Sequence, residues 1–229
     1  MIYGDSLEEL KGNLAEGELE FLGKYEPPIR ELFGELAGKR AIRTTFTLGQ
    51  SQRLVSYRIT LNSIAYLHQN VMNFTGFSVE KRNKLIDYLK SEGLVMENLG
   101  DQMFSIIANG YHNHIEDLKI HMELFIDFGL ICAELGKNER DFKSFKWMVD
   151  RLKEIKENNN FLEFLSSKTR NSIAHKTYFF KDGMIHFCDE IFDNDPITME
   201  LSDFMIESKN MNILALSFIH IWGDMFKNK

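Results

Sequence analysis

The last predicted helix, which begins at Ser202 and continues to Met225, constrains the fold more than any other segment. Its apolar residues exceed the single stripe of an amphipathic helix and include Ile213, Leu214, Leu216, Phe218, Ile219 and Ile221. A helix that is apolar on several faces has to be enclosed by other elements. We therefore expect it to be buried in a helical bundle, with part of its surface left to meet a partner chain.

The composition is typical of a mainly helical protein. The chain has 229 residues, of which 44% are hydrophobic, so a buried core can form. Its three prolines lie outside the long periodic segments. No secretory signal precedes the two cysteines, and no apolar run approaches the roughly 20 residues of a membrane span. We expect a soluble cytoplasmic protein that does not enter a membrane.

The N-terminal region carries no recognisable chemistry. Residues 6–37 predict two short helices separated by Pro27-Pro28, because proline usually ends a helix. Residues 41–48 alternate weakly between apolar and polar side chains and predict a short strand. We interpret residues 1–50 as an N-terminal arm.

Helical periodicity is clearest in the C-terminal half. Three amphipathic helices are predicted from residue 111 to Gly136, from about 139 to Asn158, and from Asn160 onward. Asn160 and Glu163 have the spacing of a capping box at the start of the third. A β-hairpin that turns at Asp182-Gly183 then precedes the last helix. The predicted fold is a helical bundle with an inserted hairpin.

Residues 78–110 predict a helix from Ser78 to Gly93, a polar turn, and a short strand over 103–108. This segment resembles the recognition helix and wing of a winged-helix domain, which we place at 51–110. The resemblance implies that three cations lie on a helix that enters a DNA groove: Lys81, Arg82 and Lys84. The alternative, which the acidic surroundings favour, is that they are ordinary solvent-facing charges, because winged helices also serve as protein-contact modules.

The third C-terminal helix contains the sequence RNSIAH, in which four residues separate Arg170 from His175. This spacing, with the polar Asn171 after the arginine, resembles the motif of nucleases of the HEPN superfamily. The resemblance covers residues 111–229 and implies a HEPN-like helical domain there. It also implies RNA cleavage without a metal or other cofactor, in which the ribose 2′-hydroxyl attacks the adjacent phosphate.

The motif supplies the groups that this reaction needs. His175 offers an imidazole, a group whose unperturbed pKa of about 6.5 suits an acid or a base at neutral pH. The Arg170 guanidinium can contact two phosphate oxygens, and Asn171 can orient the imidazole or the substrate. Arg170 and His175 point about 140° apart on a straight helix. We therefore expect a homodimer in which two copies of the motif form one site.

Further residues near the motif are predicted to contact RNA, namely Lys168, Lys176 and Tyr178. The segment 137–181 is locally basic although the whole chain has a net charge of −7. A solvated helix face is an equally good explanation of these charges.

Two other groups of residues resemble metal sites. His114, Asp117 and His121 share one helix face, with His112 nearby, and His186 and Cys188 are two apart on a predicted strand. The alternative for the first group is a polar helix face. Neither group has a complete ligand set, so we predict no metal.

The leading functional hypothesis is thus a metal-independent endoribonuclease, a toxin or defence effector that has a cognate antitoxin. The alternative is a non-catalytic HEPN-like dimer that acts as a DNA-binding regulator or as an interaction module.

Overall fold

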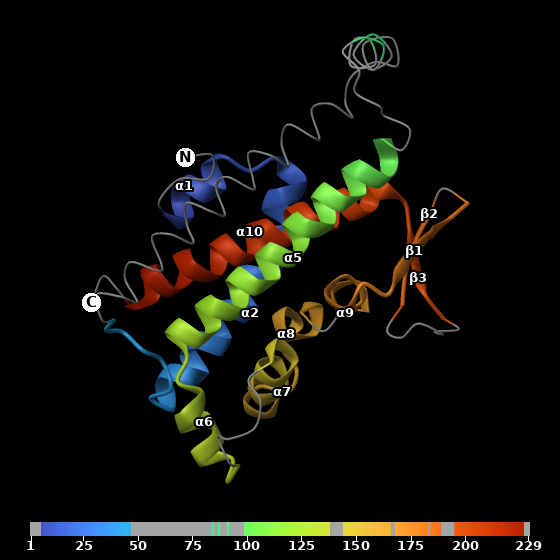
Figure 1. Ribbon diagram of the computed structural model, residues 1–229. Coiled ribbons are helices and arrows are strands. Elements are labelled where there is room, and N and C mark those ends of the chain that lie inside the picture. The colour runs from blue at the N-terminus through green and yellow to red at the C-terminus, as the bar shows by residue number, and fades with distance from the viewer. Residues whose placement is uncertain are drawn as a thin grey trace.

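The protein is mainly helical, and its helices pack into a single bundle with a small sheet at one end (Figure 1). The computed structural model describes residues 6–46, 84, 87, 91, 99–137, 144–165, 168–182, 184–188 and 195–226. Among the helices in these ranges, none combines the length and the apolar character that a membrane span requires. The predicted mainly α class is confirmed.

The helices are α1 (Leu7–Gly12), α2 (Glu16–Gly38), α5 (Leu99–Phe125), α6 (Phe128–Glu134), α7 (Phe145–Ile155), α8 (Asn160–Phe164), α9 (Lys168–His175) and α10 (Leu201–Phe226). The strands are β1 (Tyr178–Lys181), β2 (Met184–Phe187) and β3 (Ile197–Met199).

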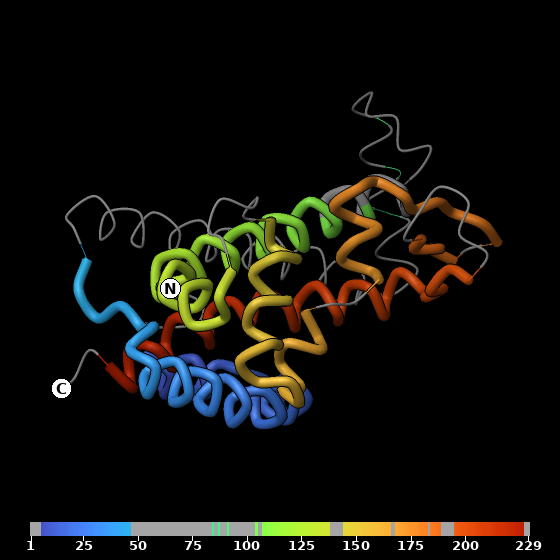
Figure 2. Tube along the Cα trace, turned by 90° about the horizontal axis from the view of Figure 1, so that it is seen from below, coloured from blue at the N-terminus to red at the C-terminus, as the bar shows by residue number. Residues whose placement is uncertain are grey.

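Helix α10 is the centre of the bundle. It packs along α5 and α2 and also contacts α1, and the views of Figures 1 and 2 show α2 and α5 running beside it. Its residues from Met211 to Phe218 are all buried. The apolar faces predicted from the sequence are therefore covered within one chain, and they no longer argue for a partner.

Phe218 of α10 is completely buried where several helices meet. Its ring centroid lies 4.8 Å from that of Phe33 on α2 and 5.7 Å from that of Phe161 on α8. The ring of Phe125 on α5 lies 6.1 Å away. These separations are typical of favourable aromatic pairs, so Phe218 joins three helices from distant parts of the sequence.

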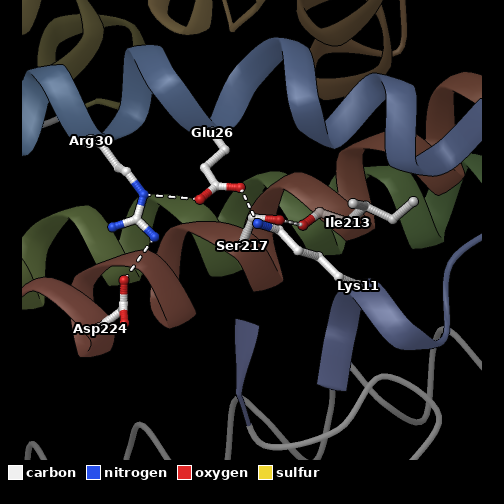
Figure 3. A network of polar contacts seen from close by, with 6 residues as sticks. All are labelled: Lys11, Glu26, Arg30, Ile213, Ser217 and Asp224. Carbon is white, nitrogen blue, oxygen red and sulfur yellow. Dashed lines mark hydrogen bonds and ion pairs between the residues drawn. The ribbon is translucent and has the colours of Figure 1, made fainter. Parts of the chain in front are cut away.

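A polar network at the surface also ties α1, α2 and α10 together (Figure 3). Glu26 on α2 accepts a hydrogen bond of 2.9 Å from Arg30 Nε and pairs with Lys11 on α1 at 2.7 Å. Arg30 also donates to Asp224 near the end of α10 at 2.7 Å. The pKa of Glu26 is lowered because its two cationic partners outweigh the opposing effect of burial.

The prediction that Pro27-Pro28 separates two helices is wrong. Helix α2 continues through both prolines, and the break lies earlier, between α1 and α2. A proline within a helix removes a backbone donor and usually costs about 3 kcal/mol. Here the apolar side chains on both sides of the prolines, Leu22 and Ile29 among them, are buried in the same core, and this packing outweighs the local cost.

The strand predicted over residues 41–48 is also absent from its described part, 41–46. Only Ile42 forms an isolated antiparallel bridge, with Ile126. The backbone N–H of Arg43 donates to the Phe125 carbonyl and that of Asp127 donates to the Ala41 carbonyl, each at 2.8 Å. This short pairing ends α5 at Phe125, and Asp127 then caps α6 by accepting from the Gly129 N–H.

The strand predicted over 103–108, which would form the wing, is wrong because α5 occupies Leu99–Phe125. Residues 84, 87 and 91 are helical, in agreement with the helix predicted over 78–93. Lys84 is exposed, whereas Lys81 and Arg82 lie outside the described residues. The domain boundaries and the DNA contacts stay predictions.

The third amphipathic helix is divided in two, α8 and α9. Asn159, not Asn160, caps α8 by accepting from the Leu162 N–H, and it also donates to the Pro28 carbonyl at 2.9 Å. Because α8 ends at Phe164, the third predicted helix does not continue without a break to Lys168.

The predicted hairpin is confirmed. Strands β1 and β2 pair antiparallel, with Tyr178 opposite Phe187 and Lys181 opposite Met184. The sequence analysis missed β3, which pairs antiparallel with β2 to complete a sheet of order β1-β2-β3.

The position of Phe218 leads to a stability prediction. Phe218→Ala should lower the free energy of unfolding by about 3–5 kcal/mol, because the cavity would remove contacts with three helices. Ile206→Ala on the same helix should change it by no more than about 0.5 kcal/mol, because Ile206 is 53% exposed. Urea denaturation followed by circular dichroism measures both. Equal effects of the two changes would contradict the central position of Phe218.

Candidate functional site

The RNSIAH motif lies in α9, which packs against α5 and leads directly into the sheet (Figure 1). His175 is the last residue of α9, and β1 begins three residues later. The motif therefore lies where the helical bundle joins the sheet.

Arg170 is buried in the bundle, with only 4% of its surface exposed. Its guanidinium carbon lies 4.8 Å from the centre of the Phe145 ring on α7, a distance suited to a cation–π contact. We expected Arg170 to act on a substrate outside the core, but the structure places its side chain within the core. Burial lowers the pKa of Arg170, and the nearby Tyr111 and Asp150 partly oppose this effect.

Asn171 is the polar partner of the buried arginine. Nη2 of Arg170 donates a hydrogen bond of 2.7 Å to Oδ1 of Asn171, whose side chain is half-buried. The other terminal nitrogen of this guanidinium, Nη1, is also buried, and no described group accepts a hydrogen bond from it. Arg170 thus fixes Asn171 from the inside of the bundle.

His175 is exposed at the end of α9. Among the described residues, no hydrogen bond or ion pair joins it to Arg170 or Asn171. One copy of α9 therefore does not bring the arginine and the histidine together, as the helical geometry of the sequence indicated.

Ser172, a residue of the motif that the sequence analysis assigned no role, is completely buried. Its hydroxyl donates to the Thr177 carbonyl at 2.9 Å and accepts from the Cys188 N–H at 3.0 Å. The Thr177 hydroxyl in turn donates to the Cys188 carbonyl. These bonds join the end of α9 to both strands of the hairpin.

Lys176 ends α9 in the left-handed conformation, with φ of 56°. The Lys176 N–H donates to the Ile173 carbonyl and the Thr177 N–H donates to the Ser172 carbonyl, which is the pattern of a Schellman motif. This backbone turn directs the chain from the helix into β1 and leaves the Lys176 side chain exposed.

The three predicted RNA contacts have different surroundings. Lys176 is exposed, and Lys168 donates from Nζ to the Asp195 carbonyl at 2.5 Å. Tyr178 is half-buried, and its ring lies 4.9 Å from that of Phe104 on α5, on the core side of the sheet.

The alternative metal site on α5 consists of buried residues that lie in the bundle. His114 shares a hydrogen bond of 3.3 Å with Asn212 of α10, and the His121 ring stacks on Phe125 at 5.9 Å. Burial lowers the pKa of His121 to about 3. Across the described ranges, no three side chains of the types that bind metal are arranged to hold an ion.

His186 and Cys188 have separate surroundings as well. The His186 ring stacks on Phe179 and its Nδ1 lies 3.1 Å from the Thr198 hydroxyl, whereas Cys188 is buried and forms no disulfide with a described residue. Nothing in the described residues unites them into one site.

Comparisons with protein-family models, with curated proteins and with solved structures gave no significant match.

The buried position of Ser172 generates a second prediction. Ser172→Ala should lower the free energy of unfolding by about 1–3 kcal/mol, because it removes a buried donor and acceptor that three backbone and side-chain groups share. Ser202→Ala, at an exposed serine, should change it by at most about 0.5 kcal/mol. Thermal unfolding of both variants provides the test, and a neutral Ser172→Ala would show that the hairpin does not depend on this hydroxyl.

Asp117 generates a prediction about pH. Burial raises its pKa from 3.8 to about 6, with a smaller contribution from Glu116, so the folded state favours the protonated carboxyl. The unfolded state then binds fewer protons between these values, and stability should fall as the pH rises from about 4 to 7, by up to about 3 kcal/mol.

Asp117→Asn should remove this contribution. The difference in unfolding free energy between the variant and the wild type should therefore grow across that interval, as measured by urea denaturation at several pH values. A constant difference would mean that the pKa of Asp117 is the same in the folded and the unfolded protein.

Proposed function

We propose that this protein is a metal-independent endoribonuclease of the HEPN type, in which the RNSIAH motif acts at the exposed end of α9. The observation that carries the proposal is the position of His175, which is solvent-exposed at the end of a helix that is otherwise firmly held. An imidazole in this position is accessible to a large substrate and is the type of group that most often serves as a general acid or base.

The proposed reaction transfers a phosphoryl group within the RNA strand. The 2′-oxygen forms a bond to phosphorus, the bond from phosphorus to the 5′-oxygen breaks, and a 2′,3′-cyclic phosphate and a 5′-hydroxyl result. A base accepts the proton of the 2′-hydroxyl and an acid protonates the leaving 5′-oxygen. No electrons are transferred, and no oxidant or reductant is required.

A homodimer suits this chemistry. One imidazole cannot accept a proton from the 2′-hydroxyl while it donates one to the leaving oxygen, whereas two His175 side chains from two chains can divide these tasks. A two-fold axis beside α9 would bring the two copies together. The dimer is part of the proposal, and so is RNA as the partner.

We assign Arg170 a positioning role. Its 4% exposure and its contact with Phe145 leave no room for a phosphate beside the guanidinium, whereas its bond to Asn171 Oδ1 holds that amide near the surface. The cations suited to contact the phosphates are Lys176 and Lys168, which flank the motif in the sequence.

The second candidate function is a non-catalytic interaction or regulatory module. The burial of Arg170 and of Ser172 favours it, because both residues of the motif serve the packing of α9 irrespective of any reaction. Binding of DNA through Lys81, Arg82 and Lys84 belongs to this alternative. A cognate antitoxin belongs to the first.

Removal of the imidazole tests the proposed reaction. His175→Ala should reduce RNA cleavage by a factor of about 10² or more in the presence of excess chelator, because the acid-base group is lost. The variant should keep the stability of the wild type, because His175 is exposed. Gel analysis of a mixed single-stranded RNA, with mapping of cyclic phosphate ends, measures the loss.

The matched control is His112→Ala, which removes a half-buried histidine of α5 and should leave cleavage unchanged. Arg170→Met keeps an unbranched apolar stem against Phe145 but removes the bond to Asn171, so it should reduce cleavage about as much as Asn171→Ala does. Cleavage by His175→Ala at the wild-type rate would refute the assignment of the site.

A further inference from the structure

The outer face of the three-stranded sheet presents an exposed aromatic ring in a fixed position. Phe179 of β1 is 47% exposed, and its ring stacks on that of His186 of β2 with centroids 4.7 Å apart and planes 2° from parallel. The two residues are directly opposite each other in the ladder. His186 is in turn held by the Thr198 hydroxyl of β3, at 3.1 Å from Nδ1.

The opposite face of the sheet is the one that packs on the bundle. Alternate side chains of a strand point to opposite faces, and Tyr178 and Phe180 both contact the Phe104 ring of α5. Phe179 and Lys181 therefore share the outer face. Phe179 is thus an exposed apolar side chain of the outer face, whereas Phe180 and Ile197, which are also partly exposed, belong to the face that packs on the bundle.

Two exposed lysines lie near the Phe179–His186 pair, although this part of the chain is not basic as a whole. From residue 168 to residue 200 the sequence contains four Lys or Arg residues and six acidic residues, and of the four cations Arg170 is buried and Lys168 is bonded to the Asp195 carbonyl. Lys176 and Lys181, at the two ends of the strand that carries Phe179, are exposed and form no ion pair with a described residue. Asp195 and Glu200 flank β3, which lies at the far edge of the sheet from β1.

We propose that this outer face binds single-stranded RNA, with a nucleobase stacked on the ring pair of Phe179 and His186 and with the phosphates beside Lys176 and Lys181. A flat aromatic surface bordered by cations is the combination that single-stranded nucleic acids use, because every base has a stacking face and every nucleotide carries a negative charge. A protein partner of acidic character would satisfy the lysines but would leave the planar ring pair without a matching group.

This inference rests on the proposed function and extends it, because the outer face of the sheet lies near His175. Phe179 is four positions after His175, so their Cα atoms lie at most about 14 Å apart. The bonds of Ser172 and Thr177 to Cys188 fix the sheet to the end of α9. An RNA strand bound on the outer face of the sheet would therefore pass close to His175, and the sheet would position the RNA for cleavage.

The test measures binding apart from cleavage. The probe is a fluorescein-labelled 2′-O-methyl RNA of about 12 nucleotides, which has no 2′-hydroxyl to react and matches the usual site sizes. Fluorescence anisotropy in chelator compares the full-length wild type with Phe179→Ala, with Phe179→Trp and with Leu130→Ala. Leu130 on α6 is the matched control because it is 49% exposed and lies away from the sheet.

Phe179→Ala should weaken binding by about 5- to 150-fold, the loss typical of one base–aromatic stack. Phe179→Trp and Leu130→Ala should bind like the wild type. Lys181→Ala should lower the slope of log affinity against log salt by about 0.7, as expected when one phosphate contact to a single strand is lost.

Absence of wild-type binding, or equal binding by Phe179→Ala and wild type, would overturn the inference. A change in molar mass of Phe179→Ala by light scattering, with RNA affinity unchanged, would also overturn it and would assign this face to a second copy of the chain. The measurements distinguish failure of the ribonuclease proposal from failure of the proposed RNA-binding surface. Binding that depends on Phe179 without any cleavage refutes the ribonuclease alone, whereas cleavage that depends on His175 but not on Phe179 refutes the RNA surface alone.

Discussion

Enclosure of α10 is the constraint on which the rest of the structure depends. A helix that is apolar on all sides is stable in water only when other elements cover it, and here α1, α2 and α5 do so. Phe218 illustrates the arrangement, because its ring contacts aromatic rings of α2, α5 and α8. Buried residues of α1 and α2 thus belong to the same hydrophobic core as those of α5, α8 and α10.

The parts of the fold that were predictable are those with strong local signals. The Asp182-Gly183 turn between alternating apolar residues predicted the hairpin, and the apolar content of 202–225 predicted the last helix. Two predictions were wrong because tertiary packing determined the local structure: the helix break at Pro27-Pro28 and the wing strand over 103–108. The apolar residues of 103–108 suit a strand or a buried helix equally well in so short a window, and α5 shows that they belong to a helix.

The site was predictable only in part for a similar reason. The sequence places Arg170 and His175 on one helix and indicates that they diverge, but it does not show that Phe145 covers the guanidinium. Nor does it show that Ser172 links α9 to the strands, because its partners, Thr177 and Cys188, lie up to 16 residues away. A buried arginine and a buried serine beside an exposed histidine thus give three motif residues three different physical roles.

These roles make the end of α9 a rigid support for an exposed surface. Arg170 holds Asn171 from within, Ser172 anchors the hairpin, and the chain then displays His175, Lys176 and Phe179 to solvent. Side chains held on such rigid elements lose little freedom when a ligand binds, which favours both affinity and reaction. The same contacts would serve a non-catalytic interaction module, so binding of RNA at this surface is what distinguishes the two candidate functions.

The central claim is that RNA meets this protein at the end of α9 and on the adjoining sheet. Photo-crosslinking tests it most directly: His175→Ala protein, which should leave the RNA intact, is irradiated with single-stranded RNA that contains 4-thiouridine, and mass spectrometry identifies the crosslinked peptides. The account predicts crosslinks in peptides that contain Phe179 or His186, and their loss on competition with unlabelled RNA. Crosslinks confined to other parts of the chain, such as α1 and α2, would contradict it.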